Sequence, residues 1–255
     1  MGVADIHTHS MYSGFSRYSC LSYPDSVSTP RTLVRVAEKL GLDILCITDH
    51  NSIKGGIEAR KYNKELVVVG EEISSKDGEI IGLFLQETIK PGLGAEETIE
   101  LIREQDGIAI APHPFSAHCS CLGHKVRELD LDGIEVFNAV HRDGYSNAIA
   151  LERSKGFATL GGSDAHASFM IGNGYTLFKG SSQEEMRDAI KRKETSYGGE
   201  VTPLWDFVSY SIRVAYQSSK IILNFNGTEC PMSDRIGMMR KSSKTFYFFC
   251  SFMYA

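Results

Sequence analysis

The sequence contains no segment typical of a secretory signal or of a membrane span. Its first residues lack the charged start and apolar stretch of a signal peptide, and no uninterrupted apolar run is long enough to cross a bilayer. Its six cysteines follow no regular framework, which predicts reduced thiols instead of disulfides. We therefore expect a cytoplasmic protein that has no membrane partner.

Several common catalytic signatures are also missing. The chain has neither the glycine-rich loop of nucleotide-hydrolysing enzymes nor the nucleophile elbow of serine hydrolases. Its formal net charge of −5 argues against broad nucleic-acid binding, because such binding depends on Lys and Arg neutralising phosphates. We expect no stable nucleic-acid complex, and a metal-dependent hydrolysis becomes the favoured chemistry if metal ligands are present.

What the chain does contain is a regular alternation of short apolar runs and amphipathic segments. Runs of strand length occur at residues 2–7, 43–48, 65–70, 79–85, 107–111, 133–137, 157–160 and 175–178. Helical spacing occurs at residues 30–40, 95–105, 145–155 and 183–193. Strands that alternate with helices predict a mostly parallel α/β sheet, and this order favours a barrel with helices outside.

The alternation stops near residue 204. We therefore expect a catalytic barrel over residues 1–203 and a C-terminal extension of unassigned structure over residues 204–255. The pattern gives no indication of the oligomeric state.

Side chains that can bind metal follow six of the predicted strands. They are His7 and His9, Asp49 and His50, Glu71 and Glu72, His113, Asn138, and Asp164 and His166. Because α/β barrels place their active sites at the carboxyl ends of strands, this coincidence predicts one shared site. So many ligands exceed the three of a catalytic zinc site and imply two or three ions, an arrangement suited to phosphate-ester hydrolysis.

The segment between His118 and His124 contains two cysteines, Cys119 and Cys121. Structural zinc sites usually separate paired cysteines by two to four residues, whereas here a single residue lies between them. We therefore interpret these thiols as incidental features of a loop.

The ordered set of motifs resembles the PHP (polymerase and histidinol phosphatase) superfamily, especially its small stand-alone members. The motifs are Asp5-Ile6-His7-Thr8-His9, Thr48-Asp49-His50, Gly70-Glu71-Glu72-Ile73, Ala111-Pro112-His113-Pro114 and Gly162-Ser163-Asp164-Ala165-His166. The resemblance covers about residues 1–200. It implies a distorted (β/α)7, TIM-like barrel and a site with two or three divalent ions of manganese, iron or zinc.

The resemblance also assigns the ligands of each ion. The first ion would be held by His7, His9, Glu72 and Asp164. A second would share Glu72 and take His113, with Asn138 as the third ligand and His141 as the nearby alternative.

The third ion would be held by His50 and His166, together with a residue from the loop after His9. Many family members carry Asp or His five residues after the second histidine, where this chain has Gly14. The candidates to replace that ligand are Ser13, Cys20 and Asp25.

The activity implied by the resemblance is hydrolysis of a phosphate ester of a small metabolite or nucleotide. The attacking group would be a metal-bound hydroxide held at Glu72 and Asp164. Arg17 and Arg142 lie in loops at the predicted mouth of the barrel and are candidates for binding the substrate phosphate.

Two alternatives remain open. Amidohydrolase barrels also begin with His-x-His and end with Asp, although Thr48-Asp49-His50 and Glu72 favour the phosphoesterase. A metal-stabilised binding or regulatory module would be marked by missing ligands, and only the Gly14 position clearly departs in that way.

Overall fold

The apolar runs form the strands of a single sheet in the computed structural model, which describes residues 1–14 and 25–224, with side chains to residue 220. The strands in these residues are β1 (Gly2–Asp5), β2 (Ile44–Ile47), β3 (Val67–Ser74), β4 (Glu79–Leu83), β5 (Ile108–Ala111), β6 (Gly133–Asn138), β7 (Ala158–Gly162), β8 (Gly174–Phe178) and β9 (Ser196–Gly199). Their order is β7-β6-β5-β4-β3-β2-β1-β8-β9. Seven of these nine strands point in the same direction and only β4 and β8 run opposite to them, so the prediction of a mostly parallel sheet is confirmed for strand direction.

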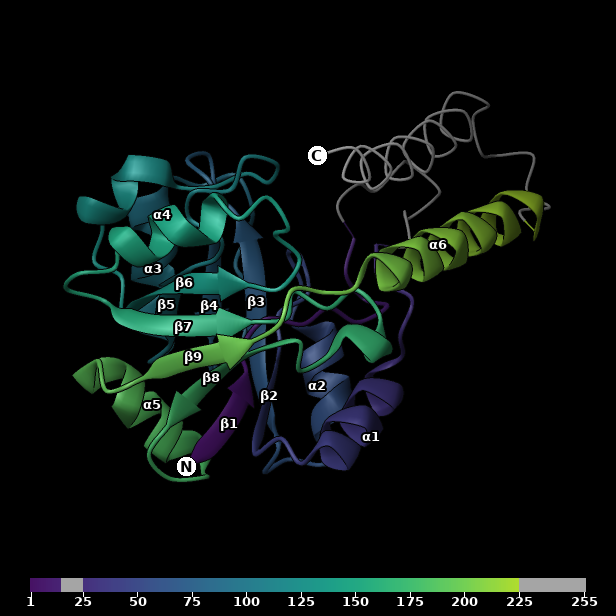
Figure 1. Cartoon of the computed structure of the whole chain (residues 1–255), viewed down its shortest axis with the longest axis horizontal. Coiled ribbons are helices and arrows are strands. Elements are labelled where there is room, and N and C mark those ends of the chain that lie inside the picture. The colour runs from purple at the N-terminus through teal and green to yellow at the C-terminus, as the bar shows by residue number, and fades with distance from the viewer. Residues whose placement is uncertain (15–24, 225–255) are drawn as a thin grey trace.

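Helices cover the outside of this sheet (Figure 1). They are α1 (Pro30–Leu40), α2 (Lys54–Arg60), α3 (Ala95–Glu104), α4 (Ser146–Glu152), α5 (Gln183–Arg192) and α6 (Leu204–Asn224), with short 3-10 turns at Gly123–Arg127 and Ser168–Met170. Helix α1 begins and ends as its sequence predicts. The Thr29 side chain accepts a hydrogen bond from Thr32 N, and Gly41 adopts a left-handed conformation at the other end.

The side chains of each strand alternate between the barrel interior and the helical layer. In β2, Ile44 and Cys46 pack inside the barrel, whereas Leu45 and Ile47 pack outward in the cluster that contains α1. Residues of α5 join the interior cluster and therefore cover one end of the barrel. The opposite end, where the parallel strands terminate, is left for polar side chains.

Helix α6 begins at the residue where the alternation was predicted to stop. Phe207, Tyr210 and Val214 pack against the cluster formed by α1 and its neighbours, and the rest of the helix extends away from the barrel (Figure 1). None of the helices in the described part of the chain combines the length and apolar character needed to cross a membrane. Most of the predicted extension, from residue 225 on, lies outside the described residues.

The two ends of the sheet meet closely enough to form a nearly closed barrel, as the resemblance predicted. The Thr176 hydroxyl in β8 donates to the Gly161 carbonyl in β7 and accepts from the Gly161 N–H, both at 2.9 Å. This approach requires glycine, because a Cβ at Gly174 would lie 2.1 Å from the Gly162 carbonyl oxygen. The barrel departs from seven simple β/α repeats, since β3–β4 is a hairpin and β8 is antiparallel to both neighbours.

We expect Thr176→Val to lower the free energy of unfolding by about 3 kcal/mol, because it leaves both polar groups of Gly161 buried without a partner. Thr176→Ser keeps the hydroxyl and should cost only about 1 kcal/mol for the lost methyl group. Urea unfolding followed by circular dichroism measures both. Equal stability of the Val variant and the wild type would contradict this account of the seam.

Candidate metal centre

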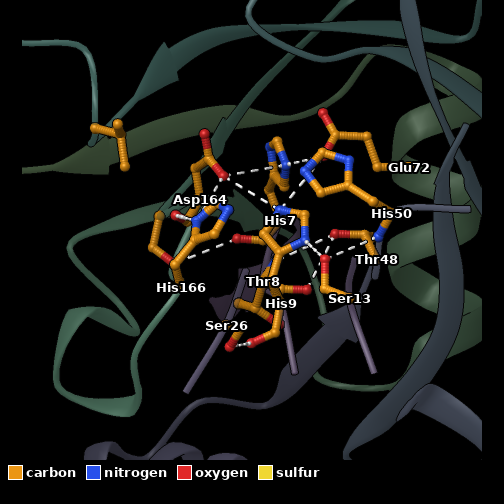
Figure 2. A network of polar contacts seen from close by, with 12 residues as sticks. His7, Thr8, His9, Ser13, Ser26, Thr48, His50, Glu72, Asp164 and His166 are labelled. Carbon is orange, nitrogen blue, oxygen red and sulfur yellow. Dashed lines mark hydrogen bonds and ion pairs between the residues drawn. The ribbon is translucent and has the colours of Figure 1, made fainter. Parts of the chain in front are cut away.

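The segments that follow the parallel strands are joined to one another at one end of the barrel. His9 N donates to the Ala165 carbonyl at 2.9 Å, which ties the segment after β1 to the segment after β7. His50 and Glu72 form a parallel bridge between the segment after β2 and strand β3. Figure 2 shows the side chains that consequently face a common centre, which are His7, His9, His50, Glu72, Asp164 and His166.

The Glu72 carboxylate lies in the middle of this group and is 1% exposed. Its Oε2 lies 3.3 Å from His7 Nε2, 3.4 Å from His9 Nε2 and 3.1 Å from His50 Nδ1. Its Oε1 lies 3.1 Å from His113 Nε2. Burial alone would raise the pKa of Glu72, but the charges of His50 and His7 outweigh it and hold that pKa well below its usual range.

Glu71 and Glu72 point to opposite faces of β3, which continues through both residues to Ser74. The Glu71 carboxylate accepts a hydrogen bond from Ile89 N at 2.8 Å, on the side away from the histidines. Burial raises the pKa of Glu71 to about 8. The strand therefore presents only Glu72 to the centre, which is the choice that the family resemblance indicated.

The ligand atoms of the centre gather into overlapping groups, each with its atoms within 4.8 Å of one another. The groups are His7, His9 and Asp164; His7, Glu72 and His113; His50, Glu72 and Glu79; His9, Asp25, His50 and His166; and His113, Cys119 and His141. All of the predicted histidine, Asp and Glu ligands appear in them. Two further members, Glu79 and Cys119, were not predicted as ligands.

Asp25, one of the three candidates to replace the ligand missing at Gly14, lies beside His50 and His166. Its Oδ2 lies 3.2 Å from His166 Nε2 and 3.8 Å from His50 Nε2. Burial opposes the charged form, but His166 and His50 outweigh it and hold the pKa of Asp25 well below its usual range. The Ser13 hydroxyl donates to the same carboxylate at 3.0 Å, so Ser13 positions this ligand, and Cys20 lies outside the described residues.

Glu135 in β6 supports the centre from behind. Its Oε1 lies 3.1 Å from His7 Nδ1, and its Oε2 accepts hydrogen bonds from His113 N at 2.8 Å and from Asn138 Nδ2 at 3.0 Å. Such a carboxylate fixes the orientation of a metal-binding imidazole. Sequence reasoning missed Glu135 and Glu79. For Glu135, a charged residue inside an apolar strand is itself a signal, because buried charges need partners.

Asn138 and His141, the two candidates for the remaining ligand of the second ion, differ in their hydrogen bonds. The Asn138 amide nitrogen also donates to Asp164 Oδ2 at 3.1 Å, and its carbonyl oxygen accepts from Val140 N at 2.9 Å. His141 is 3% exposed, and neither ring nitrogen has a hydrogen-bond partner among the described residues. Asn138 thus orients Asp164, while His141 keeps one ring nitrogen available to bind a cation.

Of the two arginines predicted to bind phosphate, only Arg142 lies in the described part of the chain, and it has a backbone partner. The Arg142 guanidinium donates to the Thr202 carbonyl at 2.5 Å, which ties the loop after β6 to the segment before α6. Arg17 lies outside the described residues.

The donor set fits divalent cations. His9 Nε2, His113 Nδ1 and both His141 nitrogens are buried without hydrogen-bond partners in the described part of the chain, and such atoms are costly unless something binds them. Burial and the neighbouring His166 lower the pKa of His9 to about 3, so its imidazole is the neutral, metal-binding form. Mixed imidazole and carboxylate donors accept zinc, iron or manganese.

Part of the chain matches a known protein family, and a longer part is similar to a curated protein. Residues 146–195 match the family model described as PHP-associated. The uncharacterized protein MJ1587 of Methanocaldococcus jannaschii is 55% identical over 153 residues, which cover 59% of this chain and 90% of that protein.

Two solved structures share the fold. One is a two-domain protein from Bacteroides vulgatus that contains a predicted PHP-like metal-dependent phosphoesterase, with a TM-score of 0.60 and 18% identity over 78% of this chain; the chain spans 64% of that protein. The other is the lesion-specific endonuclease Q of Pyrococcus furiosus, with a TM-score of 0.52 and 18% identity, covering 75% of this chain and 56% of that one. At these identities the likeness shows the fold alone.

We expect Glu135→Gln to weaken the binding of divalent ions by roughly 10- to 100-fold, because the amide keeps only one acceptor oxygen for His7 and His113. Competition with a chromogenic chelator measures the affinity. Glu100→Gln on the exposed face of α3 is the matched control and should bind ions as the wild type does. Unchanged affinity in the Glu135 variant would show that this carboxylate does not support the ligands.

Proposed function

Because the chain belongs to the PHP superfamily, we propose that its histidines and carboxylates bind two or three divalent ions and that the protein hydrolyses phosphate esters. The observation that carries this proposal is the buried Glu72 carboxylate, which lies within 3.4 Å of four imidazoles from three separate segments. These are His7 and His9 after β1, His50 after β2 and His113 after β5. A carboxylate so placed can bridge two cations.

The three groups of donors suit separate ions. His7, His9, Glu72 and Asp164 would hold one ion, Glu72 and His113 would contribute to a second, and Asp25, His50 and His166 would hold a third. Bound ions of this kind lower the pKa of water and offset negative charge on a phosphoryl group. The ions are those expected from the sequence, namely zinc, iron or manganese.

The chain itself contributes orientation and charge. Asn138 Nδ2 holds the Asp164 carboxylate, and Glu135 holds the His7 ring from the side opposite Glu72. Ser13 Oγ lies 3.3 Å from His9 Nδ1 and also donates to Asp25, so a single hydroxyl positions donors from two groups. Positioned donors lose little orientational freedom when a charged substrate binds.

Asp25 also bears on the alternative of a non-catalytic module. That alternative depended on the missing ligand at Gly14, and an aspartate from later in the same loop lies beside His50 and His166 instead. Since the donors of the third group are present, hydrolysis is better supported than a purely structural use of metal.

The substrate class proposed is a phosphate ester of a small metabolite or nucleotide. The expectation that nucleic acid is excluded has lost its support, because endonuclease Q, which shares the fold, has been crystallised with a 27-mer duplex that contains an abasic lesion. A substrate panel therefore needs an aryl phosphate monoester, an aryl phosphate diester and an abasic DNA duplex.

We expect the purified protein with added Mn²⁺ to hydrolyse at least one member of this panel, and His7→Ala to lower the rate by roughly 100-fold or more. His7 contacts Glu72, Asp164 and Glu135, so its loss removes a ligand of the first ion and a partner of the Glu72 carboxylate. His124→Ala, an exposed histidine outside the centre, is the control and should keep full activity. No turnover with any divalent ion, or equal rates in the two variants, would overturn the proposal.

We expect Asp25→Asn to reduce the number of tightly bound ions by one per chain, because the amide loses the negative charge that faces His50 and His166. Elemental analysis after gel filtration counts the ions. Asp188→Asn on the exposed face of α5 is the control. An unchanged metal content in Asp25→Asn would show that this group does not hold an ion.

A further inference from the structure

The loop between β5 and β6 brings a cysteine to the edge of the centre. One ligand atom from each of His113, Cys119 and His141 lies within 4.8 Å of the others. These residues come from the end of β5, the following loop and the segment after β6. Their approach is a product of the fold, and the short spacing of Cys119 and Cys121 gave no reason to expect it.

His141 is the independent sign that this group binds something. Its side chain is buried, and neither ring nitrogen has a hydrogen-bond partner among the described residues. The Asp143 carboxylate lies 3.8 Å from His141 Nδ1, which is too far for a hydrogen bond. The ring lies beside that of His113, with centroids 5.7 Å apart. Leaving such an imidazole without a partner is costly, whereas a cation between these rings would satisfy it.

The loop conformation directs Cys119 in particular. The Ser116 hydroxyl accepts hydrogen bonds from the backbone N–H groups of His118 and Cys119, at 3.1 and 2.9 Å. Cys121 is occupied differently, since its Sγ donates to the Ser116 carbonyl at 3.5 Å. The two thiols of this loop are thus distinguishable, and Cys121 supplies a built-in reference.

We propose that His113, Cys119 and His141 bind a thiophilic divalent ion, such as Zn²⁺, Co²⁺ or Fe²⁺, through a Cys119 thiolate. The inference deepens the proposed function, on which it rests, by giving one ion of that centre a sulfur ligand from a loop. The Asn138 amide is engaged with Glu135 and Asp164, so His141 takes the place at this strand end. Binding releases the thiol proton to solvent, and sulfur favours these ions over Mg²⁺ or Mn²⁺.

Cobalt substitution tests the proposal directly. The full-length protein is stripped with a chelator, titrated with Co²⁺, and scanned for the visible bands of bound cobalt and the near-ultraviolet thiolate-to-cobalt charge-transfer band. Wild type and Cys121→Ser should show both kinds of band. Cys119→Ser should keep the visible bands of the other sites but lose the charge-transfer band.

The outcomes separate this proposal from the proposed function. A charge-transfer band of equal strength in Cys119→Ser, or no such band in wild type that binds cobalt, would overturn the thiolate ligand and leave the phosphoesterase intact. Failure of wild type to bind any cobalt would overturn both. Loss of a ligand should weaken binding by about 100-fold or more. If the His141→Ala variant binds the ion that gives the charge-transfer band as tightly as the wild type does, His141 is not one of its ligands.

A second measurement covers the case in which Cys119→Ser fails to fold. Wild-type protein is treated with iodoacetamide with and without saturating Zn²⁺, and alkylation of each cysteine is followed by mass spectrometry. Zinc should slow the alkylation of Cys119 by about tenfold or more, because a metal-bound thiolate is a poorer nucleophile, and should leave Cys121 unchanged. Equal protection of both thiols, or of neither, would overturn the proposal.

Discussion

A buried negative charge at Glu72 is the constraint around which the rest of the centre is arranged. A carboxylate removed from water is strongly destabilising unless positive charge or hydrogen-bond donors surround it. Here four imidazoles surround it, and the charge must be balanced by protons on those rings or by cations. Burial lowers the pKa of His113, but its hydrogen bond to Glu72 outweighs burial and raises that pKa to about 9. The same attraction serves a divalent ion equally well.

Closure of the barrel is what allows these charges to meet. Asp164 and His166 follow β7, at one end of the strand order, and reach His7 and His9 only because the segments after β1 and β7 pair beyond the strands. The glycines of the β7–β8 seam permit that approach. Asp164 itself has a left-handed φ of 50°, a conformation that a non-glycine residue adopts at a cost of about 1 kcal/mol or more. The centre therefore depends on backbone contacts as well as on its polar side chains.

The strands and the gathering of polar side chains at their ends were predictable, because both follow from simple periodicity and from the rule that barrel strands end at the active site. The positions of Glu79 and Glu135 at the centre were harder to predict. The face of the sheet on which a strand residue lies depends on the hairpin register and on the twist of the closed sheet. Asp25 was one of three candidates, and its place beside His50 and His166 depends on tertiary contacts that the sequence does not show. Asn138 illustrates the opposite case, where a predicted ligand position is occupied by hydrogen bonds to Glu135 and Asp164.

The donors differ in chemical character across the centre, and this difference would affect how tightly each proposed ion is held. Asp25 lies with His50 and His166, which follow β2 and β7, while Cys119 lies with His113 and His141, which follow β5 and β6. Carboxylate oxygen accepts hard ions and exchanges them readily, whereas thiolate retains softer ions such as zinc. Glu72 contacts histidines from both sides, so an ion held firmly by sulfur would fix this carboxylate for the more exchangeable neighbour. The unequal donors would thus favour a centre that retains one ion tightly, while the identity of its other ions depends on which divalent ions are available.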